Sequence, residues 1–140
     1  MKTVTTLLVL LITATLVGCG DGGEAVLKRR SNLQQLGDAY LRFHTENGKS
    51  PKGASELIDF MSGGAEDEKT TDAITALEEG DITMIWTANI YPEESENAKY
   101  LLGFEAGVPS TGGYVVMGDS QVKLMTGKDY AEAKTIPPAP

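Results

Sequence analysis

The sequence holds very few of the residues on which disulfide, metal and nucleophilic chemistry depend. Cys19 is the single cysteine and His44 the single histidine among 140 residues. One cysteine excludes an intramolecular disulfide and the zinc patterns built from several cysteines. One histidine excludes a metal site that draws several imidazoles from the same chain. We therefore expect no metal, no other cofactor and no catalytic residues.

Basic residues are also scarce, with 12 lysines and arginines against 20 acidic residues and a net charge of −8. Nucleic acids and anionic lipid surfaces are bound through clustered basic side chains. The charge balance therefore argues against a nucleic acid partner. The length fits one domain that can bury its own core.

No apolar run reaches the roughly 20 residues that a membrane-spanning helix needs. The longest run, Val4–Val17, follows Lys2 and has the length of the apolar region of a signal peptide. It ends in Leu16-Val17-Gly18-Cys19. The segment predicts an exported protein, in which a lone cysteine requires an explanation.

That tetrapeptide resembles the bacterial lipobox, a motif in which the cysteine receives a diacylglycerol and the leader is cleaved just before it. The resemblance implies a signal peptide over residues 1–18, with Leu16, Val17 and Gly18 as the cleavage motif. Cys19 would carry the lipid, and residues 19–23 would form a short tether. The protein would then be an exported, acylated (palmitate-bearing) lipoprotein on the periplasmic face or the cell surface. The alternative is an ordinary signal peptide with an incidental cysteine.

The first half of the mature chain predicts helices. Apolar residues recur every three or four positions from Glu24 to about Thr45, and Asn47-Gly48 predicts the end of that helix. We interpret the next three segments in order as a short helix, an exposed loop and one or two further turns: Ser55–Met61, Ser62–Thr71 and Asp72–Glu79.

The second half shows the period of two that is typical of strands. Alternation over Ile82–Ile90 predicts a strand with Trp86 in the core, and a second strand is expected to place Tyr100, Leu102 and Phe104 on one face. The strands after the first are expected at Lys99–Glu105, Gly112–Met117 and Gln121–Thr126. We predict an α+β domain over residues 24–130, with the long helix on a three- to four-stranded antiparallel sheet. The proline-rich tail, residues 131–140, is expected to be disordered.

Two separated motifs resemble the planctomycete pilin-like proteins, which are themselves similar to type II secretion pseudopilins of the G class. The first is the run Asn32–Ala39, followed by Phe43-His44, Gly48 and Pro51, which resembles the helix exit of that family.

The second motif resembles the closing hairpin of the same family and consists of Gly112-Gly113, Val115-Val116, Asp119 and Val122–Leu124. Pro109 stands where the family has a histidine and Ser120 where it has a glycine. The lipoprotein leader stands where pilins carry their polymerising stalk. The resemblance therefore implies a non-catalytic structural or interaction module. It would dock through its sheet face on protein partners in envelope, secretion or surface assembly.

Several polar or aromatic residues have both a functional and a structural interpretation, and we favour the structural one in each case. His44 is either a metal ligand or base, or a residue that caps the C-terminal end of the helix. The acidic residues Glu66–Glu68 with Asp72, and Glu93–Glu96, are calcium loops or solvated loops, and they lack the EF-hand spacing. Asp119 is a ligand or a turn residue. Trp86 and Tyr91 form a binding surface or pack internally. The alternative function is a small periplasmic lipoprotein that binds a ligand or calcium, or an enzyme.

Overall fold

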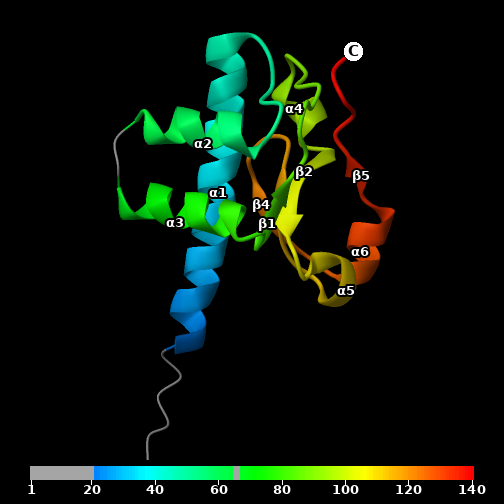
Figure 1. The fold of residues 1–140 in the computed structure, drawn as a ribbon. Coiled ribbons are helices and arrows are strands. Elements are labelled where there is room, and N and C mark those ends of the chain that lie inside the picture. The colour runs from blue at the N-terminus through cyan, green and yellow to red at the C-terminus, as the bar shows by residue number, and fades with distance from the viewer. Residues whose placement is uncertain (1–20, 65–66) are drawn as a thin grey trace, which may run out of the picture.

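One long helix organises the fold. In the computed structural model, which describes residues 21–64 and 67–140, α1 runs from Asp21 to Asn47 (Figure 1). Its buried apolar side chains recur at the predicted spacing: Leu33, Leu36, Tyr40 and Phe43. The helix ends as predicted, because Gly48 takes a left-handed φ of +67° and donates its N–H to the His44 carbonyl at 2.8 Å.

Helix α1 begins earlier than predicted. Asp21–Gly23 belong to its first turn, so the expectation of a tether is wrong for these residues, while Cys19 and Gly20 lie outside the described part. A glycine costs about 1 kcal/mol relative to alanine inside a helix. Each residue added to an existing helix nevertheless gains a backbone hydrogen bond. Gly22 and Gly23 therefore extend a helix that the following residues nucleate.

Two further helices pack with α1 as one layer: α2, Ala54–Ser62, and α3, Glu68–Glu78 (Figure 1). Helix α3 is longer than predicted and begins inside the segment expected to be a loop. The Asp67 carboxylate accepts the Thr70 N–H at 2.7 Å, which caps the helix. Ala73, Ala76 and Leu77 are buried, so packing holds a helix that its polar sequence only weakly predicts.

The sheet confirms the predicted α+β fold. Its antiparallel strands lie in the order β1 to β4: β1, Ile82–Met84; β2, Tyr100–Glu105; β3, Gly113–Met117; and β4, Val122–Met125. A short helix, α4 (Glu94–Asn97), precedes β2.

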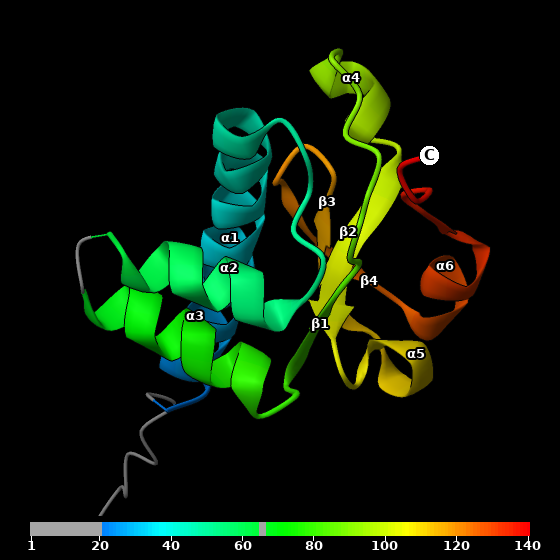
Figure 2. The same cartoon turned by 45° about the horizontal axis from the view of Figure 1, so that its top comes forward.

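Both faces of the sheet are covered (Figure 2). Helices α1–α3 lie on one side, over the larger core. On the other side lie α5, Val108–Thr111, and α6, Gly127–Glu132. This second side buries a smaller cluster: Leu101, Val108, Val115 and Met117. Helices α5 and α6 thus cover part of the sheet that was expected to be open, whereas Lys123 and Leu124 of β4 remain exposed.

A bulge in β2 changes which side chains share a face. The register with β3 shifts between Leu101 and Gly103, and this reverses the alternation of the following residues. Leu102 packs in the larger core, whereas Phe104 packs on the opposite side, edge-on to Tyr130 with ring centroids 5.1 Å apart. The prediction that Phe104 shares a face with Leu102 is therefore wrong.

The strand predicted over Ile82–Ile90 ends at Met84. Beyond it the Tyr40 hydroxyl donates to the Ile85 carbonyl at 2.9 Å and accepts the Ala88 N–H at 3.0 Å. The Ile85 carbonyl and the Ala88 N–H thus bond a side chain instead of a neighbouring strand. The chain turns at Thr87, whose φ is 56°. Trp86 packs against the core as predicted, with its ring stacked 6.3 Å from that of Tyr40.

The C-terminal tail is ordered, so the prediction of disorder over residues 131–140 is wrong. Residues 131–132 end α6, and β5, Lys134–Thr135, pairs in parallel with β2. Ile136 is 1% exposed and donates its N–H to the Leu101 carbonyl at 3.0 Å. Prolines lack an N–H but keep their carbonyls, and the Pro137 carbonyl accepts the Asn89 N–H at 2.8 Å.

Candidate functional site

The predicted lipidation site precedes the described part of the chain. Leu16, Val17, Gly18 and Cys19 all lie outside it, and α1 begins two residues after Cys19. The N-terminal end of α1 projects beyond α3 and α5 in Figure 1. No helix within residues 21–64 and 67–140 combines the length and apolar character needed to cross a membrane.

The two motifs that carry the pilin-like resemblance lie against each other. Gly37 of α1 faces the turn between β3 and β4, where a Cβ atom on it would lie 2.7 Å from Val116 Cγ2 and 3.1 Å from Ser120 Oγ. Only glycine fits this approach without displacing its neighbours. The Ser120 hydroxyl donates to the Asp38 carboxylate and accepts from Gln34 Nε2 at 2.9 Å. A helix and a hairpin far apart in the sequence are thus joined by packing and by hydrogen bonds.

Ser120 has a conformation that suits the glycine found there in the resembling family. Its φ is 67°, in the left-handed region, which costs a residue other than glycine about 1–3 kcal/mol. The side chain is buried and bonded to α1, which offsets that cost. Asp119 accepts the Gln121 N–H at 3.1 Å, so its interpretation as a turn residue is confirmed.

A second polar network closes the other end of α1. Ser50 Oγ donates to the Ala88 carbonyl at 2.6 Å and lies 3.2 Å from His44 Nδ1, in the last turn of the helix. The Tyr40 hydroxyl bonds the same segment from the helix side. Burial raises the pKa of Tyr40, while its hydrogen bonds with Ala88 and Ser50 act in the opposite direction. His44 and Tyr40 therefore hold the loop after α1 to the segment after β1.

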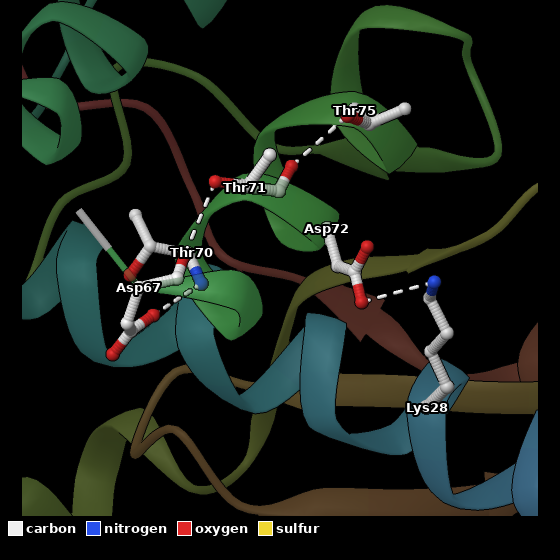
Figure 3. Close-up of polar contacts among 6 residues, drawn as sticks. All are labelled: Lys28, Asp67, Thr70, Thr71, Asp72 and Thr75. Carbon is white, nitrogen blue, oxygen red and sulfur yellow. Dashed lines mark hydrogen bonds and ion pairs between the residues drawn. The ribbon is translucent and has the colours of Figure 1, made fainter.

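Three residues of the two acidic loops have structural partners: Asp67 and Asp72, which Figure 3 shows, and Glu96. Asp72 Oδ2 lies 2.9 Å from Lys28 Nζ. The Thr70 N–H that Asp67 accepts holds the pKa of that carboxyl below its ordinary value. Glu96 pairs with Lys99 at 2.5 Å, whereas Glu66 is outside the described residues. Within residues 21–64 and 67–140, no three His, Cys, Asp or Glu side chains are grouped to hold a metal ion.

A pocket of about 350 Å³ with both polar and apolar walls opens between α1, the start of β1 and the turn after β2. The polar and charged side chains that line it are Arg29, Asn32, Asp81, Glu105 and Thr111. They come from segments far apart in the sequence, so the fold alone brings them together.

Glu105 is the most firmly held of these groups. Its side chain is at the end of β2, where Oε2 accepts the Tyr114 N–H at 2.7 Å and Oε1 lies 3.5 Å from Arg29 Nη1. A Cβ atom on Gly113 would lie 2.7 Å from that Oε2, and one on Gly112 would lie 2.6 Å from the Met125 carbonyl. The paired glycines of the hairpin motif therefore make room for the Glu105 carboxylate and for the neighbouring strand.

Comparison with protein-family models, with curated proteins and with solved structures found no match to this chain. Its function therefore has to be inferred from these residues and their arrangement.

Sequence reasoning missed the pocket. Asn32 stood out only as the first residue of a motif, and Glu105 only as the end of a predicted strand. The one usable signal was Gly112-Gly113, because two adjacent glycines before a strand indicate a close approach by another group. The identity of that group could not be predicted, since Glu105 reaches Tyr114 only through the register of β2 with β3.

Proposed function

We propose that the chain is a lipid-anchored envelope protein whose pilin-like head is a non-catalytic structural or interaction module. The observation that carries this proposal is the contact between the two resembling motifs. Gly37 and Asp38 belong to the first motif, and both meet the hairpin of the second at Ser120. Because both motifs lie at one contact between the helix and the hairpin, they belong to the same part of the fold. This supports the origin of both in a pilin-like head.

The position at which α1 begins supports a short connection between the lipid anchor and the head domain. The helix begins two residues after Cys19 and rises about 1.5 Å per residue. Leu33, its first buried apolar side chain in the described part, thus lies about 18 Å along the axis from Asp21. Two or more acyl chains on Cys19 would give stable membrane attachment. The head would then stand close to the bilayer on a helical stem.

The stem differs in character from the stalk of a pilin. Residues 22–30 are mostly exposed, and they include Glu24, Lys28, Arg29 and Arg30. Charged side chains on an exposed helix disfavour the apolar packing on which a filament core depends. This favours a head held singly at the membrane over a subunit polymerised through its first helix.

The proposal is tested by cross-linking in intact cells, with detergent extraction and mass spectrometry of what co-purifies with the tagged full chain. The control is the Cys19→Ala chain, which keeps the head and loses the predicted lipid. We expect the wild type to cross-link reproducibly to a small set of envelope or assembly proteins, and the control to lose most of that set. Equal recovery from both chains, or none from the wild type, would contradict the proposal.

A further inference from the structure

A nearly buried side-chain amide with no protein partner lines the pocket. Asn32 is 7% exposed, and its amide forms no hydrogen bond with any residue of the described ranges. Among those residues, every fully buried side-chain nitrogen or oxygen has a hydrogen-bond partner. The amide of Asn32 therefore keeps some contact with solvent, and Asn32 lines both this pocket and the groove between α1 and α3. An amide offers both donors and an acceptor, so it can form hydrogen bonds with a ligand in the pocket.

The charges of the pocket favour a ligand with a positive group. Arg29 contributes one positive charge, and Asp81 and Glu105 contribute two negative charges. Glu105 already shares its charge with Arg29 and the Tyr114 N–H. The carboxylate of Asp81, by contrast, forms no hydrogen bond or ion pair within the described residues, although its backbone carbonyl accepts the Ala106 N–H. One uncompensated negative charge therefore faces a site that also offers an amide.

We propose that this pocket binds an α-ammonium carbonyl group, as in a free amino acid or at the amino end of a peptide. The ammonium group donates to the Asp81 and Glu105 carboxylates. The adjacent carbonyl oxygen accepts from the Asn32 amide, and Arg29 supplies a further donor at the mouth. An amide both donates and accepts, so Asn32 also suits the N–H of a following peptide bond.

The size and composition of the pocket agree with this ligand class. A volume of about 350 Å³ lies at the lower end of the range for small-molecule sites, which suits one or two residues. Two carboxylates within one pocket repel a simple anion.

The test is isothermal titration calorimetry of the full chain in detergent with three probes. These are L-alanine, L-alanyl-L-alaninamide and N-acetyl-L-alaninamide, the last of which lacks the ammonium group. We expect heat from at least one of the first two and none from the third. Tighter binding of L-alanine identifies free amino acids as the source, and tighter binding of the dipeptide amide identifies peptide ends. The absence of binding heat from both L-alanine and L-alanyl-L-alaninamide, or equal binding of the acetylated probe, overturns the proposal.

Two variants locate the binding. Asp81→Asn changes an exposed residue and should weaken binding at least about tenfold, since a hydrogen bond to a charged group contributes that much. Asp59→Asn changes another exposed aspartate, on α2 and outside the pocket; it is the matched control and should leave binding unchanged. Asn32→Leu should weaken binding while the thermal midpoint shows that the chain still folds. Equal losses in Asp81→Asn and Asp59→Asn, or none in Asp81→Asn, would contradict this assignment of the site.

Discussion

The contact between α1 and the β3–β4 hairpin can be tested by adding one methyl group. Gly37→Ala places a Cβ atom 2.7 Å from Val116 Cγ2, well inside van der Waals contact. Valine is stiff at χ1, and Ser120 Cα lies 3.4 Å from the same point, so neither neighbour can move freely. Overpacking of this kind costs about 1–3 kcal/mol.

The same substitution also gains about 1 kcal/mol, because alanine favours a helix more than glycine does. Gly23→Ala is the matched control, since a Cβ atom there meets nothing within 4 Å. The helix-propensity gain largely cancels between the two variants. Gly37→Ala should therefore be less stable than Gly23→Ala by about 1–3 kcal/mol. For a domain of this size, each kcal/mol shifts the thermal midpoint by about 4 °C.

The assay is urea denaturation followed by the fluorescence of Trp86, the only tryptophan, which is partly buried against the core and stacks on Tyr40. The double variant with Val116→Ala should recover part of the loss, giving a coupling energy of about 1 kcal/mol. Equal stability of Gly37→Ala and Gly23→Ala, together with additive effects in the double variant, would refute the close approach of helix and hairpin.

Two other substitutions test the segments where the structure departs from the sequence prediction. Tyr40→Phe should cost about 1–3 kcal/mol, because the Ala88 N–H and the Ile85 carbonyl lose their partner. Burial raises the pKa of Tyr40, so its contribution is complete below about pH 10 and is lost as the pH rises through the folded-state pKa. Urea midpoints between about pH 9 and pH 11 should fall less steeply in Tyr40→Phe than in the wild type, and parallel curves would count against the buried hydroxyl. Ile136→Ala should cost about 2–5 kcal/mol, whereas Lys134→Ala on exposed β5 should cost little. Equal, small effects in urea denaturation would mean that the tail does not pack.

The elements that the sequence predicts well are those whose pattern is local. The apolar stripe of Leu33, Leu36, Tyr40 and Phe43 predicts the body of α1, and Gly48 predicts its end, although the helix begins earlier than predicted. The last two strands follow from alternation and the turn at Asp119. In each case, neighbours in the sequence determine the structure.

The failures share one physical cause, which is that backbone partners come from elsewhere in the chain. The alternation of Ile82–Ile90 continues past Met84, but the Tyr40 hydroxyl and the C-terminal tail take the hydrogen bonds that a strand would need. The tail looked disordered because of its prolines, yet Ile136 anchors it beside β2. The pocket depends on the same kind of long-range placement, because Asn32 and Glu105 meet only in the folded chain.

The measurement that tests the central claim most directly is mass spectrometry of the N-terminal peptide of the mature protein, purified from the membrane fraction of the native bacterium. The account predicts a chain that begins at Cys19 and carries a diacylglycerol, with or without a further acyl group. It also predicts that the Cys19→Ala chain carries no diacylglycerol and is not cleaved before residue 19. An unmodified cysteine in a chain cleaved elsewhere, or a Cys19→Ala chain processed at the same position as the wild type, would contradict the lipid anchor and the function proposed from it.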